Sequence, residues 1–343
     1  MTYKIYAAII IKLALIIFKR CELKKYILSK LLMGLVTIVF SFVLTFFLIR
    51  LAPGTPMRIV AGKENPNPEQ IEHLTEKYGL DKPVGVQFIN YIKNMAKGDF
   101  GFSYRNNLPV FELIKRRIVP TLTLSLTSNI ISALLGGFLG LYIGRKKDGP
   151  LDKVFSYISY VLDALPGFWL AMILIMIFSS KLGWFPTSGM YNMRESYTGL
   201  RKFIDLLYHM TLPILSIVII QTPIYFRIAR ASVINTMKLG FIKTFRAAGM
   251  KEGEIFRKYI MKNSLIPILT TFSMSLAFTI SGAALIEIVF SWPGMGRLII
   301  DSINGRDYMV LNGLYLIISV SLIFFTILTD VLYALVDPRI RIK

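Results

Sequence analysis

Long apolar runs separated by short polar segments make up most of the chain. A helix needs ~20 largely apolar residues to cross the ~30 Å hydrocarbon layer of a membrane, and six runs approach or exceed that length. The pattern therefore predicts an all-α polytopic membrane protein with six spans. The predicted spans are Leu31 to Ile49, Leu122 to Ile143, Val154 to Ser179, Leu212 to Ile228, Leu265 to Phe290 and Leu311 to Leu335.

Residues 1–29 form a basic and apolar extension before the first span, which we place at residues 30–51. Its apolar run from Ile5 to Phe18 would make only ~21 Å of helix, and Lys12 lies near its centre. A lysine at mid-membrane costs ~3 kcal/mol, which roughly offsets the ~4.5 kcal/mol that strongly apolar neighbours return. Three interpretations stay open: a helix on the membrane surface, a seventh span, or an upstream extension.

The segment 52–119 is too long for a simple connector and is predicted to form a helical cap outside the membrane. Asn67 and Pro68 are typical of a helix start, and Gly79 of its end. A second helix is expected from Val84 to Lys97, and Pro109 should start a third that leads into the membrane. Residues 120–343 then form the core transmembrane domain.

Lysines and arginines cluster before the first span, between the second and third, between the fourth and fifth, and after the sixth. If six helices alternate, all four clusters fall on one side. Positive charge gathers in cytoplasmic loops, so both termini are predicted to be cytoplasmic.

Composition supports a membrane protein and excludes several other classes. Hydrophobic residues make up 54% of the chain and charged residues only 17%, with a mean hydropathy of +0.58. The net charge of +20 comes mostly from loops between apolar runs, which argues against nucleic-acid binding. The single Cys21 allows no internal disulfide, and His73 and His209 lack the spacing of metal ligands.

The sequence contains no GxxxxGK[ST] motif and no cluster of catalytic groups. It therefore cannot hold ATP phosphates in a P-loop, and we expect neither an enzyme nor a bound cofactor. Any use of ATP must belong to a partner.

A basic segment between the fourth and fifth spans, within the loop 230–264, is built for contact with another protein. On a helix, Phe241, Ile242 and Phe245 would form one apolar patch, with Lys243 and Arg246 beside it. Gly249 can adopt left-handed backbone angles, so one short helix can end there and a second can start at a new angle. The alternative is a basic helix resting on anionic lipid.

Four positions are candidates for a transport pathway. Asp163 is ionisable at membrane depth and lies just before Pro166, Gln221 polarises the fourth span, and Glu287 lies near the end of the fifth. The structural alternatives are that Asp163 faces a wet interior or bonds a neighbouring helix, that Gln221 serves ordinary helix packing, and that Glu287 snorkels or pairs with Arg297.

From about Lys24 to Ile342 the chain resembles the inner-membrane permease subunits of dipeptide and oligopeptide ABC importers. The resemblance is carried by FLIRLAPGTP, GLDKPVGVQF with GDFGFS, ALPGFWLAMILIMIFSSKLGWFPTSG, the RAAG segment and VFSWPGMGRLIIDSINGRDYMV, and by the ending DVLYALVDPRIRIK. It implies a six-helix, type I ABC importer transmembrane domain. Residues 1–22 depart from the family, whose members usually begin close to KKYILSKLL.

The resemblance also implies the partners and their contacts. A coupling loop would engage two ATPase subunits, which bind ATP and Mg, and a second homologous permease would supply the other half of the pore. An extracytoplasmic binding protein would dock near Trp292, Pro293, Gly294 and Arg297. The coupling loop consists of Phe241, Ile242, Lys243, Thr244, Phe245, Arg246, Ala247, Ala248 and Gly249.

The generic coupling motif places EAA at Lys243, Thr244 and Phe245, a poor match, whereas KTFRAAG is close to the RTARAKG of the peptide branch. Permeases of this kind serve peptides, glutathione, nickel or metal chelates, and peptides are the first expectation. An ion-coupled secondary transporter is the other class that stays open, but only Asp163 suggests the midplane groups that it needs.

Overall fold

The computed structural model describes residues 21–51, 69, 72, 75–76, 79–95, 97–277, 279 and 283–336. The extension at residues 1–20 and most of the helix predicted between Asn67 and Gly79 lie outside the described residues. In the part that the structure describes, the regular secondary structure is helical, and the only β feature is an isolated bridge between Phe102 and Pro109.

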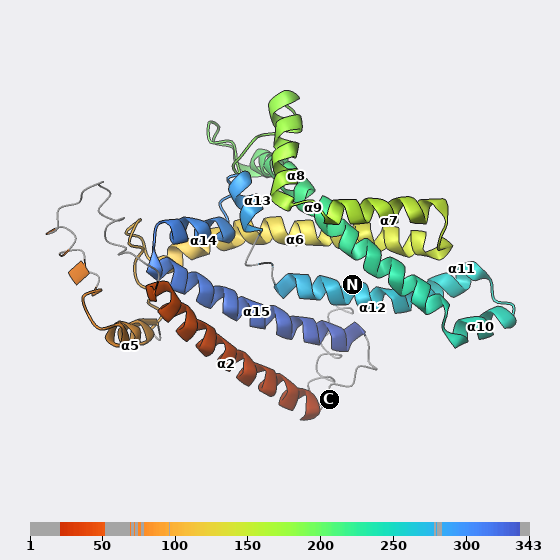
Figure 1. Cartoon of the computed structure of the whole chain (residues 1–343), viewed down its shortest axis with the longest axis horizontal. Helices are drawn as coiled ribbons and strands as arrows, with labels where there is room; N and C mark the ends of the chain where they lie inside the picture. Colours follow the sequence, from red (N-terminus) through yellow and green to blue (C-terminus); the bar gives the residue numbers. More distant parts are fainter. Residues whose placement is uncertain are drawn as a thin grey trace.

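The helices form an elongated bundle with α10 and α11 at one end and α5 at the other (Figure 1). In chain order they are α2 (Cys21–Leu51), α5 (Val84–Met95), α6 (Val110–Ile143), α7 (Pro150–Asp163), α8 (Gly167–Leu174), α9 (Gly199–Met237), α10 (Gly240–Ala247), α11 (Glu252–Ile255), α12 (Met261–Ala277), α13 (Ala284–Val289), α14 (Met295–Asn304) and α15 (Tyr308–Val336). Short π-helical segments follow α8 and α11, at Ile175–Lys181 and Phe256–Ile260.

Four helices in the described residues are long and apolar enough to cross a membrane, and a bent pair makes up to five. The four are Ser29–Leu48, Val110–Lys146, Gly199–Met237 and Tyr308–Thr329. The all-helical membrane fold is therefore confirmed. The count of six predicted spans differs from the structure at the third and the fifth.

The third predicted span is not one straight helix. Its two parts, Pro150–Asp163 and Gly167–Lys181, are bent by 98°, so that α8 points away from the bundle (Figure 1). Pro166 lies at the break with an extended ψ of 130° and has no backbone N–H to continue the hydrogen bonding of α7. Pro166, which the sequence suggested as a pathway candidate, thus breaks the helix.

The fifth predicted span divides as well, because α12 ends at Ala277 and α13 begins only at Ala284. Two elements of the predicted cap agree with the structure: α5 starts at Val84, and Pro109 precedes α6. The proposed boundary between cap and core at residue 119 falls inside α6, which continues unbroken through Pro120.

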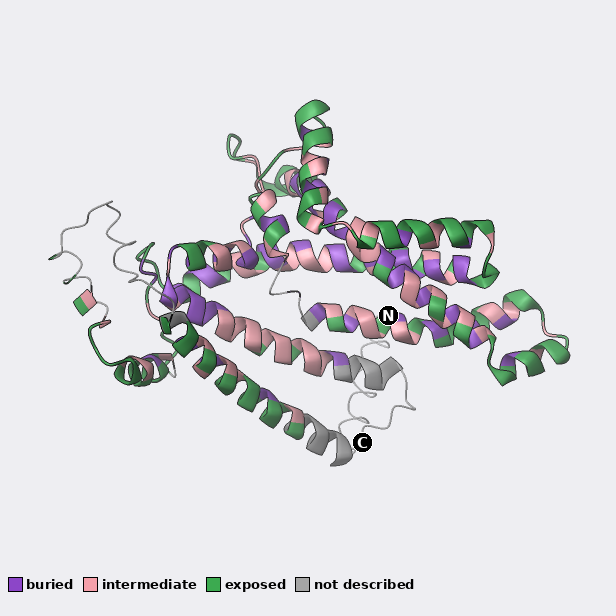
Figure 2. Cartoon of the chain, viewed as in Figure 1, coloured by how far each residue is buried: buried purple, intermediate pink, exposed green. Residues whose placement is uncertain are grey.

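Burial distinguishes the inner helices from those that face the surroundings. Figure 2 shows buried residues along α6 and α9 and exposed residues along α2 and α7. The exposed side chains of α2 are apolar, with Val36 68% and Phe40 67% exposed. Apolar residues that face outward on a helix of this length suit contact with lipid.

The closest packing in the bundle joins α6 to α9. Gly136 and Gly140 on α6, and Gly144 directly after it, recur every four residues and face α9. A Cβ atom at Gly140 would lie 2.6 Å from Ala229 Cβ, and one at Gly136 would lie 2.7 Å from Tyr225 Cβ. This small-xxx-small pattern lets two membrane helices approach backbone to backbone, and it fixes α9 against α6.

We predict that Gly140→Ala destabilises the protein by about 1–3 kcal/mol or prevents its accumulation, because overpacking forces the two backbones apart. Thermal unfolding of the detergent-purified chain measures the effect. Gly137→Ala on the same helix is the matched control, since its Cβ would meet Ile268 at an ordinary 3.6 Å. Equal effects of both substitutions would contradict the role of this contact.

Candidate functional site

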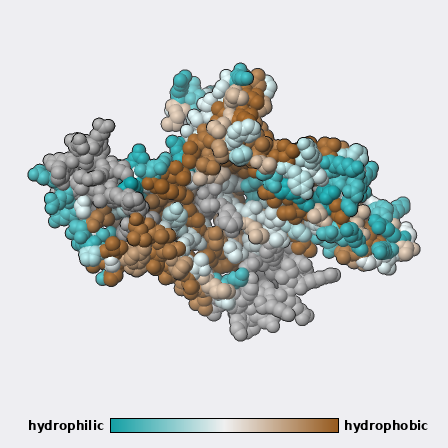
Figure 3. Space-filling view, in the orientation of Figure 1, coloured by the Kyte–Doolittle hydropathy of each residue, from teal (hydrophilic) through white to brown (hydrophobic). Residues whose placement is uncertain are grey.

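The helix α10 stands at one end of the bundle and is joined to α9 by a short turn at Lys238 and Leu239. It ends at Ala247, Gly249 has a φ of +77°, and α11 starts at Glu252. The predicted break at Gly249 is thus present. Hydrophilic residues gather at this end of the molecule (Figure 3), as expected for a segment outside the membrane.

The apolar patch predicted for α10 is divided between two faces. Ile242 is fully buried in a cluster with Val233, Ile255 and Ile260, so it anchors α10 to the bundle and is not available to a partner. Phe245 packs on Tyr259, with ring centroids 4.2 Å apart. Of the three predicted patch residues, Phe241 is the one that is exposed, with 40% of its surface accessible.

The exposed face of α10 therefore carries one aromatic residue together with basic and small residues. Phe241, Lys243 and Thr244 are exposed, and the turn of Ala247, Ala248 and Gly249 is exposed beside them. Such a face suits a contact in which one aromatic side chain enters a partner and basic groups lie at the rim. The buried Ile242 and the packed Phe245 hold it in place.

A bidentate ion pair links α10 to the start of α11. Arg246 donates from Nε to Glu252 Oε1 at 2.6 Å and from Nη2 to Oε2 at 3.2 Å. The hydrogen bond from Arg246 lowers the pKa of the Glu252 carboxyl. The pair is therefore formed at neutral pH and is lost only as the pH falls through that lowered pKa.

Asp163 bonds a neighbouring helix. Arg227 on α9 donates from Nη2 to Asp163 Oδ2 at 2.8 Å and from Nη1 to the Ser159 carbonyl at 3.2 Å. Asp163 lies at the end of α7, just before the break at Pro166. This geometry ties the bent pair to α9, in agreement with the structural alternative for Asp163.

Gln221 belongs to a polar group in the interior of the bundle. Tyr225, one turn further along α9, donates to Asn129 Oδ1 at 2.5 Å and lies 3.3 Å from Ser275 Oγ. Gln221 Oε1 and Asn129 Nδ2 are buried and find no hydrogen-bond partner among the described residues. The sequence singled out Gln221 but missed Asn129 and Tyr225, whose hydrogen bond depends on the packing of α6 against α9.

Glu287 is a fully buried carboxylate that holds a loop together. It accepts a hydrogen bond from Thr121 Oγ1 at 2.8 Å and one from the Arg297 backbone N–H at 2.9 Å. Thr121 Oγ1 in turn accepts the Met295 N–H at 2.7 Å. Gly294 packs against the carboxylate so closely that a Cβ atom would overlap it. The carboxylate thus joins α6, α13 and the start of α14.

The loop predicted to meet a binding protein is largely internal. Trp292 is fully buried, and its Nε1 donates to the Pro120 carbonyl at 3.0 Å. Gly294 is buried and Pro293 is half-buried, so Trp292 and Gly294 do not form a docking surface in this structure. Arg297 is half-exposed and lies 3.7 Å from Asp301.

A second buried carboxylate, which sequence reasoning missed, closes the other end of the bundle. Asp307 accepts hydrogen bonds from Ser103 Oγ at 2.5 Å and from the Tyr104 backbone N–H at 3.3 Å. It lies directly before α15 and also meets the Val310 N–H at 3.4 Å, so it caps that helix. Within the described residues, no group of three or more His, Cys, Asp or Glu could hold a metal ion.

Comparison with known protein families shows which family the chain belongs to. The model of the binding-protein-dependent transport system inner membrane component matches residues 136–342, and the model of the N-terminal part of such membrane components matches residues 23–127. The chain belongs to this family. It is a multi-pass component of the inner membrane, a permease subunit of an ABC transporter and not itself an enzyme.

The relatives are permeases of peptide-type systems. The chain is 33% identical to the oligopeptide transport system permease protein AppB of Bacillus subtilis (strain 168), over 92% of this chain and 99% of AppB. It is 33% identical to the dipeptide transport system permease protein DppB of Alkalihalophilus pseudofirmus, with the same shares covered. It is 34% identical to the glutathione transport system permease protein GsiC of Salmonella choleraesuis, over 93% of this chain and 99% of GsiC.

The fold resembles a solved ABC importer. The MetNI methionine ABC transporter in an inward-facing conformation matches with a TM-score of 0.53 at 16% sequence identity, over 66% of this chain and 97% of that chain. The likeness supports the fold of an ABC importer transmembrane domain and agrees with the expectation from the sequence.

We predict that Glu287→Gln lowers the unfolding temperature, because the amide –NH2 cannot accept the N–H or O–H donors that the carboxylate receives. An unsatisfied buried donor costs about 1–3 kcal/mol. Glu254→Gln, the same chemical change in an exposed pair with Lys258, is the control and should have little effect. If the two variants unfold at the same temperature, the carboxylate does not hold the loop.

Proposed function

We propose that this chain forms half of the translocation pathway of an ATP-driven importer for peptides, working by alternating access. The observation that carries the proposal is α10, a short basic helix that is held at one end of the bundle by a buried isoleucine and an ion pair. Such a helix can be pushed as one piece with the spans behind it.

The helix α9 is the element that would transmit such a push. It is a single helix of 39 residues that ends two residues before α10, and it packs on α6, α7, α8 and α12. Its glycine-mediated contact with α6 makes the two helices move together, since close-packed interfaces rearrange between discrete states and do not bend gradually.

The motor and the delivery of substrate belong to other chains. Two ATPase subunits would bind ATP and Mg and engage residues 241–249, a second homologous permease would complete the pore, and a binding protein would deliver substrate from outside. In this arrangement six spans cross the membrane, with α12 and the segment after it as the fifth. The α10 end and both termini are cytoplasmic.

The pathway itself is proposed to run past the polar group around Gln221. Buried amide and hydroxyl groups without internal partners suit a surface that exchanges hydrogen bonds with water or with a peptide backbone. Asp163, bonded to Arg227, and Glu287, bonded within its loop, are better explained as groups that hold helices in register. Arg297 stays a docking candidate on the outer side.

Peptides are favoured as substrates because the named relatives serve oligopeptide, dipeptide and glutathione systems, which share the peptide backbone. The same type of permease for nickel or metal chelates is the second candidate. An ion-coupled secondary transporter is the least favoured, because Asp163 already has an arginine partner.

Reconstituted transport tests the class of machine. In proteoliposomes that contain the full complex and its binding protein, we expect uptake of a radiolabelled dipeptide or oligopeptide. This uptake should require ATP on the side of the membrane where the ATPase subunits lie. Uptake that follows an ion gradient and needs no ATPase subunit would overturn the importer interpretation. If the complex takes up a nickel chelate with ATP but no peptide, the proposed substrate is wrong and the importer class stands.

Phe241→Asp is predicted to reduce recovery of the ATPase subunits with the tagged permease about tenfold, because a charge replaces the exposed aromatic contact. Phe102→Asp, at another exposed aromatic position near the opposite end, is the control and should leave recovery unchanged. Membrane insertion is measured in parallel by fluorescence size exclusion. Full recovery of the ATPases with both variants would remove α10 from the coupling contact.

A further inference from the structure

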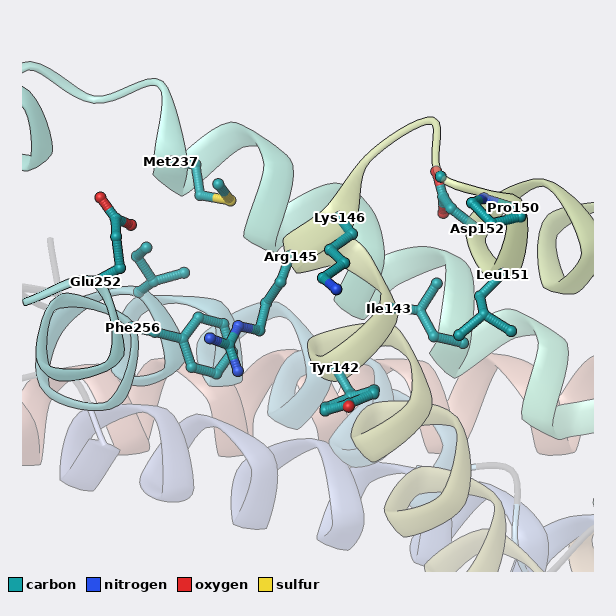
Figure 4. A pocket seen from close by; sticks show the side chains of 12 residues that line it. Tyr142, Ile143, Arg145, Lys146, Pro150, Leu151, Asp152, Met237, Glu252 and Phe256 are labelled. Atoms are coloured by element: carbon teal, nitrogen blue, oxygen red, sulfur yellow. The ribbon is translucent and has the colours of Figure 1, made fainter.

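A cavity of about 450 Å³ lies beside the α10–α11 end of the bundle. Its walls come from the end of α6 and the following turn, the start of α7, the end of α9, and α11 with the π-helical segment behind it (Figure 4). Arg145 and Lys146 extend into the space between Phe256 on one side and Leu151 on the other (Figure 4). None of the functions proposed above uses this cavity.

The two carboxylates that line the cavity are already neutralised. Asp152 is buried and binds the guanidinium of Arg230 through both of its oxygens, and it also accepts the Asp148 backbone N–H at 2.9 Å. Glu252 receives both hydrogen bonds from Arg246. Each carboxylate therefore has its own hydrogen-bonded arginine partner, and Arg145 adds only a longer-range attraction that also lowers the pKa of Glu252.

The two cations of the cavity lack such partners. The Arg145 guanidinium lies over the Phe256 ring, 4.4 Å from its centroid, which keeps the planar group in place. Among the described residues, no carboxylate lies within ion-pair distance of Arg145 or of Lys146. With Asp152 and Glu252 paired to Arg230 and Arg246, the cavity carries about two net positive charges and suits a ligand with a phosphate group.

An apolar stripe leads away from the cavity along α6. Leu134, Phe138 and Tyr142 follow one another at four-residue steps, so they lie on one face, and they are 67%, 68% and 60% exposed. The Phe138 and Tyr142 rings are stacked. On α7, Leu151 is 59% exposed beside the cavity. A free phosphate ion makes no use of this stripe, whereas an acyl chain does.

We propose that the cavity binds the headgroup of an anionic phospholipid. The phosphate lies between Arg145 and Lys146, and one acyl chain follows Leu134, Phe138 and Tyr142 along the span. Basic pockets between membrane helices are a recognised type of site for such headgroups. Because Phe256 and Glu252 follow α10 in the chain, the bound lipid would stabilise the base on which α10 rests. The proposal concerns a lipid site and does not depend on the transported substrate.

Native mass spectrometry of the delipidated full-length chain tests the site, with phosphatidylglycerol and phosphatidylcholine as probes. Arg145→Ala with Lys146→Ala should weaken phosphatidylglycerol binding roughly tenfold or more, since each basic residue contributes to holding the anionic headgroup. Lys147→Ala with Lys153→Ala removes the same charge from the same segment outside the cavity, and should change binding less than about twofold. Equal losses in both double variants would contradict a specific site.

Two further arms separate the sources of the anion and guard against misfolding. Tyr142→Ser keeps both cations and should weaken phosphatidylglycerol binding while leaving the unfolding temperature of the lipid-free chain unchanged. Inorganic phosphate should bind at least tenfold more weakly than phosphatidylglycerol to the unaltered chain. Equally strong binding of phosphate would overturn the proposal in favour of a free-anion site. Loss of ATPase recovery in the Arg145→Ala, Lys146→Ala chain without any change in its lipid binding would overturn it in favour of a protein contact.

Discussion

The contact between α6 and α9 is the constraint on which the rest of the structure depends. Glycines on α6 let the two backbones approach so closely that no side chain fits between them. This rigid pair carries α10 at one end, and at the other α6 supports the Trp292 loop through Thr121 and Pro120. The α6–α9 pair thus forms a continuous connection between the α10 end and the Trp292 loop.

Carboxylates at helix contacts, most of them buried, serve mainly to fix helices relative to one another. Asp163 with Arg227 and Asp152 with Arg230 fasten α7 to α9, Glu287 fastens α13 and α14 to α6, and Asp307 fastens the loop before α6 to α15. Each carboxylate has its hydrogen bonds satisfied, which is the condition for burying a charge without a large penalty. Among the buried polar atoms without a hydrogen-bond partner in the described residues, Gln221 Oε1 and Asn129 Nδ2 lie in the region where we propose the pathway.

The apolar runs predicted the helical membrane fold, and Gly249 predicted the break after α10, because span length and a glycine with a positive φ act locally. They did not predict the bend at Pro166 or the division of the fifth run, since both depend on what packs beside the chain. The same limit explains Ile242, whose buried neighbours Val233 and Ile255 lie on other helices. The GxxxGxxxG spacing of α6 was visible in the sequence and could have indicated the α6–α9 contact.

The central claim is that α10 lies on the cytoplasmic side, within reach of an ATP-driven motor. Cys21 is the one cysteine, so a Cys21→Ser chain that carries Lys243→Cys can be labelled in intact cells with a membrane-impermeant maleimide. The account predicts no labelling until the membrane is permeabilised, whereas Asp81→Cys in the cap should be labelled at once. Labelling of the cysteine at position 243 in intact cells would contradict the account.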